Sequence, residues 1–279
     1  ETHTQPFVGS VRCVYETALF GNGPAGPSWD GMIPEIMFYE RELTTAELEQ
    51  IFSSLALKYG ITLAQNYIAS DGTVIWDMTA NAIYHNAVAG IGKDNIGAVN
   101  QLQSKSHAGD ALITIGLDSI AADNTAHGSS FSADKSFMLW GNNGDNFSRT
   151  TYNGVVDSRM NRTWKVEETG TIGTVELSSP SFLIFTHLLV HNSDPNFGPG
   201  TIEVPLITDA NGNVFCSYDF SDGDYFTLAP GLPSPGGVFD DIDFWAKADE
   251  AVYEDAGATD LVEDGCLLYT SPSPRDIGE

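Results

Sequence analysis

Three oxygen-bearing side chains at alternate positions of one short segment form a candidate for metal chemistry. They are Asp209, Asn211 and Asn213, and side-chain oxygens are the ligands that calcium prefers. The segment lacks the terminal bidentate Glu of an EF-hand. A plain hairpin turn around the Asn-Gly pair explains the same residues. We therefore expect a hairpin here and keep calcium as the one cofactor candidate, with Asp222-Gly223-Asp224 as a second turn of this kind.

Two further patterns resemble chemical motifs and fail on spacing. Gly90-Ile91-Gly92 lacks the third glycine and the following helix of a phosphate-binding loop, so we expect a turn between strands. His187 and His191 are four residues apart, which would suit zinc on a helix. Apolar neighbours predict a strand instead. There the two imidazoles would lie about 13 Å apart, too far to share one metal.

Residues for hydrolytic catalysis follow no known arrangement. A retaining glycanase needs two carboxylates about 5–5.5 Å apart, and no Glu-x-Asp-x-x-Glu run supplies such a pair. Glu35 and Glu40 would face opposite sides of a strand. The sequence also contains no Gly-x-Ser-x-Gly nucleophile elbow. We expect no enzymatic activity, and we assign no catalytic or cofactor-binding residues.

Composition and charge restrict the partners of the chain. Over 279 residues, 42% are hydrophobic, which is enough for one large or two ordinary domains. Twelve Lys+Arg against 38 Asp+Glu give a formal charge of −26, which repels nucleic acid and anionic lipid. No apolar run reaches the roughly 20 residues of a membrane helix. We expect no nucleic-acid partner and no transmembrane segment in this chain.

Cysteines and tryptophans carry little chemical signal. The three cysteines are Cys13, Cys216 and Cys266, and their spacing matches no zinc pattern and no dense disulfide framework. The sequence is compatible both with a Cys13–Cys216 bridge and with two isolated thiols at these positions. Tryptophans stack on sugars when exposed, but four of the five lie in or beside apolar strand patterns and are expected in the core: Trp76, Trp140, Trp164 and Trp245. Trp29, among Gly, Pro and Ser, is the best suited to exposure.

One helix is predicted over residues 45–59. Thr44 suits the N-cap, Glu47 suits the return bond of a capping box, and Gly60 suits the left-handed C-terminal position. Apolar residues at helical spacing predict one stripe facing the core: Leu48, Ile51, Phe52, Leu55 and Tyr59. Immediately before the helix, Ile33–Tyr39 predicts a strand.

Beyond the helix, short β segments alternate with turn clusters. The predicted strands are Val74–Trp76, Val88–Ile91, Ala111–Ile115, Ser136–Trp140, Thr163–Glu167, Thr174–Leu177, Phe182–Val190, Ile202–Ile207, Val214–Phe220 and Tyr225–Leu228. Many short strands at regular spacing, without helical periodicity from Leu63 to Pro230, predict a mainly β fold. The expected architecture is an antiparallel, jelly-roll-like β-sandwich with one amphipathic helix.

Residues 29–63, WDGMIPEIMFYERELTTAELEQIFSSLALKYGITL, resemble the closing strand and terminal helix of a laminin-G-like (concanavalin-A-like) jelly roll of bacterial surface proteins. The matching positions are Gly31, Ile33, Glu35, Tyr39, Arg41, Leu43, Thr44, Glu47, Leu55, Ala56, Lys58, Tyr59, Gly60 and Leu63. The chain departs from the pattern at Pro34 and at Phe52-Ser53-Ser54. The resemblance implies export and carries no catalytic residues.

The middle of the chain is similar to a β-sandwich domain of unknown function that follows such jelly rolls in large exported bacterial proteins. The segments that carry this likeness include YIASDGTVIWD, YHNAVAGIGKD, NQLQSKS, DALITIGL, DKSFMLWGNNG, MNRTWKVEETG and GDYFTL. Later, PGGVFDDIDFWAKADEAVY resembles the opening strand of another laminin-G-like domain.

These likenesses imply five segments. They are the C-terminal part of a laminin-G-like domain (1–63), a complete β-sandwich domain (64–230), a Pro- and Gly-rich linker (231–237), the start of a second laminin-G-like domain (238–264) and a tail (265–279). The CLLYTSPSPRD run in the tail resembles translated sequencing adapter, as at the ends of metagenomic fragments, and a natural Ser- and Pro-rich disordered tail is the alternative.

The family likeness leads to an expected function. We expect a non-catalytic structural or adhesive module of a large secreted or cell-surface bacterial protein, whose partners are neighbouring laminin-G-like domains of the same polypeptide. Two alternatives stay open: a carbohydrate-binding module with glycan partners, and an accessory region of a polysaccharide-degrading enzyme. Exposed aromatic side chains on a sheet would favour the first alternative, and clustered carboxylates in a cleft would favour the second.

Overall fold

The computed structural model describes residues 35–154, 156, 158–180, 185–209 and 213–230, all within one unit, Glu1–Gly231. Several predictions fall outside the described residues: Cys13, Trp29, Asn211, Trp245, Cys266, and the segments 231–237, 238–264 and 265–279. The described part is mainly β, with one α-helix, so the predicted fold class is confirmed.

The elements follow one another in this order. They are α1 (Thr45–Tyr59), β1 (Tyr67–Ile68), β2 (Val74–Trp76), the 3-10 helix η1 (Ala82–Tyr84), β3 (Asn86–Asp94), β4 (Val99–Gln101), β5 (Gln103–Lys105), β6 (Thr114–Leu117), β7 (Ser136–Asn142), β8 (Arg149–Thr151), β9 (Ser158–Met160), β10 (Trp164–Thr169), β11 (Val175–Ser179), β12 (Phe185–His191), β13 (Ile202–Pro205), β14 (Ile207–Thr208), β15 (Val214–Tyr218) and β16 (Tyr225–Pro230).

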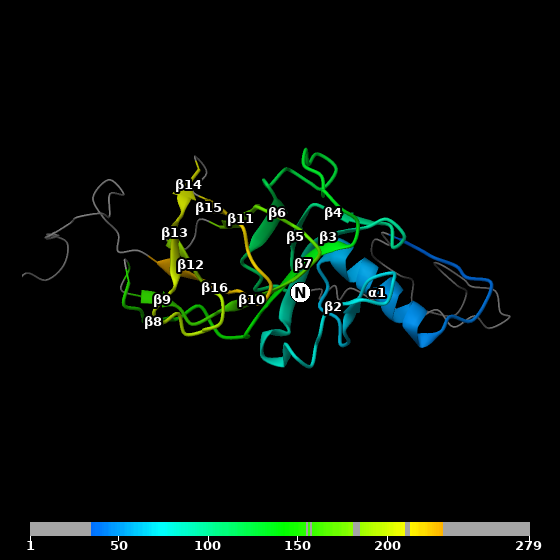
Figure 1. Ribbon diagram of the computed structural model, residues 1–279, viewed down its shortest axis with the longest axis horizontal. Coiled ribbons are helices and arrows are strands. Elements are labelled where there is room, and N and C mark those ends of the chain that lie inside the picture. Colours follow the sequence, from blue (N-terminus) through cyan, green and yellow to red (C-terminus); the bar gives the residue numbers. More distant parts are fainter. Residues whose placement is uncertain (1–34, 155, 157, 181–184, 210–212, 231–279) are drawn as a thin grey trace, which may run out of the picture. The chain divides into compact units, whose positions relative to one another are not determined.

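Two antiparallel sheets form the sandwich (Figure 1). The large sheet has the strand order β13-β12-β16-β10-β7-β3-β4, and the small sheet has the order β14-β15-β11-β6-β5. Two short hairpins, β1-β2 and β8-β9, form separate two-stranded sheets. In the described residues the two main sheets do not close into a barrel.

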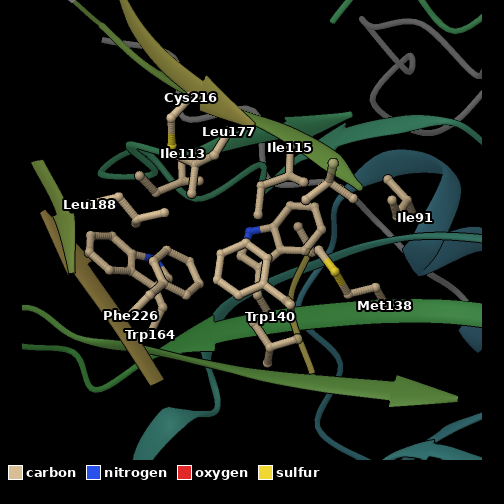
Figure 2. Packing of buried hydrophobic residues seen from close by; sticks show 14 of the residues in the cluster. Ile91, Ile113, Ile115, Met138, Trp140, Trp164, Leu177, Leu188, Cys216 and Phe226 are labelled. Carbon is tan, nitrogen blue, oxygen red and sulfur yellow. The ribbon is translucent and has the colours of Figure 1, made fainter. Parts of the chain in front are cut away.

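The inner faces of the two sheets enclose the main hydrophobic core. Trp140, Trp164 and Phe226 of the large sheet point toward Ile115 and Leu177 of the small sheet, as Figure 2 shows. Trp164 and Phe226 stack with ring centroids 5.4 Å apart. Large aromatic side chains bury the most apolar area per residue, so this layer stabilises the contact between the sheets.

On each side of the sandwich, one continuous chain segment supplies an edge strand to both sheets. β4 ends the large sheet, β5 ends the small sheet, and the single buried residue Leu102 joins them. At the opposite side β13 and β14 do the same, with Leu206 between them. Strands that switch sheets in this way make the corners of a sandwich. The edges are thereby short, which limits pairing with other chains.

Side chains and neighbouring loops complete the hydrogen bonds at these corners. The Asn124 side chain accepts from the Leu102 N–H at 2.6 Å and donates to the Asn100 carbonyl at 2.9 Å. At the other corner the Leu206 N–H donates to the Thr186 carbonyl at 2.8 Å. Each strand can therefore change sheets without leaving the N–H group of its corner residue unpaired, which would be costly if buried.

The outer face of the large sheet is also covered, by two separate sets of elements. Over β3 and β7, the helix α1, the β1–β2 hairpin and η1 pack in a cluster that includes Leu57, Trp76 and Leu139. Toward β12 and β16, a second cluster contains Tyr152, Phe197 and other apolar residues. Tyr225 is partly buried against both clusters. The large sheet therefore has apolar contacts on both faces.

The caps of helix α1 agree with the predictions. The Thr44 hydroxyl accepts from the Glu47 N–H at 3.3 Å, and the Glu47 carboxylate accepts from the Thr44 N–H at 2.8 Å. Arg41 also pairs with Glu47 at 2.5 Å. The Arg41 hydrogen bond, followed by those from Thr44, lowers the pKa of Glu47 to about 2. Gly60 adopts the left-handed conformation at φ 63°, as a C-terminal glycine commonly does.

The most buried face of the helix differs from the predicted apolar stripe. Ser53, Ala56 and Leu57 are buried, whereas Tyr59, from the predicted stripe, is 37% exposed. Small residues set this orientation because they let the helix approach the sheet closely. The Ser53 hydroxyl reaches the β1–β2 hairpin and accepts from the Ile68 N–H at 2.8 Å. A stripe based on apolarity alone cannot identify such positions.

The strand predicted at Ile33–Tyr39 is corrected by the structure over its described part. Residues 35–39 form no strand. Glu35 contacts the end of the helix, pairing with Lys58 at 3.2 Å and accepting from the Tyr59 hydroxyl at 3.3 Å. Ile36 and Phe38 are 48% and 63% exposed. Extended residues count as a strand only when a neighbouring strand pairs with them, and side-chain contacts to a helix do not supply that ladder.

The predicted domain boundary between residues 63 and 64 stays a prediction. The structure adds that the helix before this boundary and the strands after it share one hydrophobic cluster, in which Ala56 and Leu57 pack with Ile75 and Val88. In the described residues, no helix is long and apolar enough to cross a membrane.

Gly60 joins the end of the helix to strand β5. Its carbonyl accepts from the His107 N–H at 2.7 Å. A Cβ atom built on Gly60 would lie 2.2 Å from the Lys105 carbonyl oxygen. Two constraints therefore require glycine here, the positive φ and the close approach of another backbone segment.

We expect Gly60→Ala to lower the free energy of unfolding by at least about 2 kcal/mol, because the left-handed conformation and the backbone clash act together. Gly72→Ala is the matched control: Gly72 also has a positive φ of 90°, but a Cβ there would meet nothing within 4 Å. Urea unfolding should show the larger loss for Gly60→Ala. Equal losses would show that the close approach to β5 contributes nothing.

Candidate functional site

The two glycines of the Gly90-Ile91-Gly92 pattern lie within strand β3 and not in the expected turn. Packing explains both of them. A Cβ on Gly90 would lie 2.9 Å from a methyl group of Leu57 on the helix, and one on Gly92 would lie 2.4 Å from the ring of Phe137. The glycines therefore make room for neighbouring side chains on the outer face of the large sheet. They form no phosphate-binding loop.

The two histidines also lie where the strand prediction places them. His187 and His191 both belong to β12, whose described bounds are Phe185–His191. His191 Nδ1 accepts from the backbone N–H groups of Ser193 and Asp194 at 3.1 and 2.9 Å. This ring holds the turn that follows the strand.

The calcium candidate is described in part. The Asp209 carboxylate accepts from the backbone N–H and the side-chain amide of Asn213, at 2.8 and 3.2 Å. The Asp209 N–H donates to the Asn213 carbonyl at 2.9 Å. These bonds close the hairpin between β14 and β15, which supports the hairpin interpretation. No group of three or more His, Cys, Asp or Glu in the described residues could hold a metal ion, and calcium binding stays a prediction.

The second turn candidate, Asp222 and Asp224, lies beside Glu168. Asp222 accepts from the Glu168 N–H at 2.9 Å, and Asp224 accepts from the Ser221 N–H at 2.8 Å. Burial, helped by the charges of Asp219, Asp222 and Asp224, raises the pKa of Glu168. Burial also raises the pKa of Asp224. The described contacts of Asp222 and Asp224 are with backbone N–H groups that hold this turn.

The tryptophans and cysteine that the structure describes belong to the core. Trp76, Trp140 and Trp164 are at most 3% exposed, as expected. The Trp76 indole donates to His85 Nδ1 at 2.9 Å, and His85 Nε2 lies 2.6 Å from the Leu63 carbonyl. Cys216 is a free, buried thiol, and burial raises its pKa to about 12. A thiol with such a pKa is unreactive at neutral pH.

The most chemically distinctive cluster joins Ser70, Asp94 and Lys135. Asp94, at the end of β3, is 2% exposed. Its carboxylate pairs with the Lys135 ammonium group at 2.5 Å and accepts from the Ser70 N–H and hydroxyl, both at 2.8 Å. The Gly97 N–H donates a further bond at 2.8 Å. Lys135 also contacts the Ser70 hydroxyl. We call these three side chains the Asp94 tie.

The electrostatics of the Asp94 tie indicate a structural role. Burial alone would raise the pKa of Asp94, but hydrogen bonds from Lys135, Gly97 and Ser70 outweigh burial and lower the pKa to about 2. The carboxylate is therefore ionised at neutral pH, and its counter-ion is Lys135. An ammonium group held by an ionised carboxylate does not act as the base that would activate a serine. The tie instead joins the β1–β2 turn, the end of β3 and the start of β7.

The Asp94 tie was not identified from the sequence, although a signal was present. Its three members lie in three of the segments that carry the family likeness, YIASDGTVIWD, YHNAVAGIGKD and DKSFMLWGNNG. Nothing in the spacing of Ser70, Asp94 and Lys135 shows that they meet, because they are separated by 24 and 41 residues. Only the pairing of β3 with β7 and the position of the β1–β2 hairpin bring them together.

We expect Asp94→Asn to lower the free energy of unfolding by about 3 kcal/mol at neutral pH, because a buried ion pair loses one partner. The folded-state pKa of Asp94 lies below its ordinary value of 3.8. Its stabilisation is therefore present above pH 4 and is lost as the pH falls toward 2, by on the order of 2 kcal/mol.

Urea unfolding between pH 2 and pH 7 measures both effects. The variant Asp94→Asn should lack this part of the pH dependence, and Asp118→Asn, at an exposed position, should keep it. Identical slopes for the wild type and Asp94→Asn would contradict the assigned ionisation.

Comparison with known proteins adds one positive result. No curated protein and no solved structure matches the chain significantly. The family model of a domain of unknown function (DUF8202) matches residues 47–224. The match begins inside helix α1 and ends just before β16, so it includes the members of the Asp94 tie. The chain belongs to this DUF8202 family.

Proposed function

We propose that this domain is a non-catalytic structural or adhesive module that holds neighbouring domains of one exported polypeptide at a fixed separation. The observation that supports the proposal is the short length of the edge strands of the sandwich. Both of its sides end in corner strands, at Leu102 and Leu206. Short edges of this kind limit pairing between molecules, which suits a module exposed at high local concentration on a cell surface.

The internal ties support the same role. The Asp94 tie joins three segments, and Arg162, which is 5% exposed, bonds both the carboxylate and the carbonyl of Asp110 at 2.7 and 3.1 Å. The Arg162 guanidinium also lies 4.3 Å from the centre of the Phe147 ring. Buried charged groups with several partners fix one arrangement of the loops they join. A rigid module keeps the distance between the domains on either side of it constant.

The partners in this proposal are laminin-G-like domains that precede and follow the module. The likeness of residues 29–63 and 238–264 to the end and the start of such domains supports it. The same likeness is the basis for proposing that the parent protein lies outside a bacterial cell or on its surface. We also propose that the 265–279 tail is translated sequencing adapter and is no part of the parent protein. In this view the parent is longer than the chain.

Surface proteolysis tests this proposal. Protease added to intact cells of the source organism should release peptides from the parent protein. The cuts should fall outside the described strands of the sandwich, because a rigid sandwich resists cleavage within its strands. A cytoplasmic protein measured in the same samples is the control for lysis. Protection of the parent until the cells are lysed would contradict surface exposure, and frequent cuts within the described strands would contradict rigidity.

A further inference from the structure

Helix α1 carries apolar side chains on two opposite faces. The face toward the sandwich contains Ala56 and Leu57, which pack in the cluster over the large sheet. A second apolar set recurs at spacings of three and four residues, which places its members on one face of the helix: Leu48, Ile51, Leu55 and Tyr59. Two residues advance an α-helix by about 200°, so Leu55 and Leu57 point in nearly opposite directions. We call the second set the outward face.

The outward face lies outside the hydrophobic clusters of the sandwich. In the described residues, none of its four members belongs to a core cluster. Leu48, Ile51 and Leu55 are nevertheless half-buried, and Tyr59 is exposed. A helix at the surface normally has polar residues on the side away from the core, and a helix that is apolar all round is normally buried. The outward face therefore predicts a second layer that contacts the helix.

Residues 35–41 run beside the outward face. Glu35 accepts from the Tyr59 hydroxyl at the C-terminal end of the helix, and Arg41 pairs with Glu47 in the first turn. The segment therefore runs antiparallel to α1. Figure 1 shows it, in blue, on the side of the helix away from the large sheet. The chain thus reaches the outward face immediately before it enters the helix.

The polypeptide that precedes residue 35 is the cover that this connection favours. Residues 1–34 are joined directly to a segment that already lies beside the helix. A segment tethered so closely has an effective concentration on the order of millimolar, which gives it an advantage over a second copy of the chain. Its sequence includes the run FVGSVRCVYETALF, from Phe7 to Phe20. This run supplies apolar side chains that can bury the outward face.

We propose that residues 1–34 dock on the outward face of α1, so that the helix is packed between the sandwich and the polypeptide before it. Ile36 and Phe38, which are exposed in the segment beside the helix, border this interface. Such packing fixes the direction in which the preceding polypeptide leaves the module, which a free linker would not do. The interface goes beyond the proposed spacing function, because it depends only on residues of this chain and needs no exported parent.

Photo-crosslinking of the full chain tests the interface. The photoreactive residue p-benzoylphenylalanine in place of Leu55 should form an intramolecular cross-link to a peptide from residues 1–34, which mass spectrometry of the digested protein identifies. The control has the same residue in place of Ala46, which is exposed and lies about half a turn around the helix axis from Leu55. It should not form this product. A cross-link between two chains would overturn the proposal, as would the absence of any cross-link to residues 1–34.

A matched pair of variants tests the same interface without the photoreactive residue. Leu55→Ser and Leu57→Ser cost the helix the same intrinsic propensity. Leu55→Ser should speed proteolytic cleavage within residues 1–34 by at least about tenfold, because cleavage follows the population of the opened form. It should leave the urea midpoint of the sandwich unchanged. Leu57→Ser, which loses contacts in the cluster over the large sheet, should lower that midpoint.

Two results with these variants would overturn the proposal. One is an equal loss of midpoint in Leu55→Ser and Leu57→Ser, which would assign both leucines to the core of the sandwich. The other is unchanged cleavage of residues 1–34 in Leu55→Ser. Either result leaves the spacing function to be decided by surface proteolysis.

Discussion

The whole structure depends on a large sheet that is buried on both faces. Strand β7 shows this most clearly, because all seven of its residues are buried. Its even-numbered residues, such as Met138 and Trp140, face the small sheet, while Phe137 and Leu139 face the outer covers. A sheet of this kind is stable only when both of its faces are covered. Helix α1, the β1–β2 hairpin and the β8–β9 region supply that cover.

The need to cover both faces of the large sheet explains several features of the sequence. Gly90 and Gly92 lack side chains because Leu57 and Phe137 occupy the space beside them. Gly60 is required where the end of the helix meets β5. The Asp94 tie holds the β1–β2 hairpin on the sheet through Ser70. Packing on the outer face of the large sheet therefore explains the Gly90-Ile91-Gly92 pattern, which resembles a functional motif in the sequence.

Local chemistry in the sequence was enough to predict some parts of the fold. The capping box of Thr44 and Glu47, the C-terminal Gly60 and most of the apolar strands depend on interactions between near neighbours, and all are confirmed. Short polar strands such as β4, β5 and β8 were missed because their pairing partners, and not their own residues, make them strands. The orientation of the helix was missed for a similar reason, since Ser53 and Ala56 are buried by contact with distant segments.

The candidate site was less predictable than the fold. Ser70, Asp94 and Lys135 carry no common motif, and only the three-dimensional structure brings them together. Motifs of fixed spacing could be judged from the sequence, and His187 and His191 do lie on one strand as predicted. The sequence alone could not show sites assembled from residues that are distant in the chain.

The Asp94 tie shows how a buried charged group can serve the attachment of a cover. Its carboxylate receives bonds from Ser70, Gly97 and Lys135, so an added ligand would have to break existing bonds. Loss of one partner would leave a buried group unpaired, which costs more than the bond itself contributes. The tie is therefore suited to holding the β1–β2 hairpin on the sheet, and the covers depend on such contacts as much as on apolar packing.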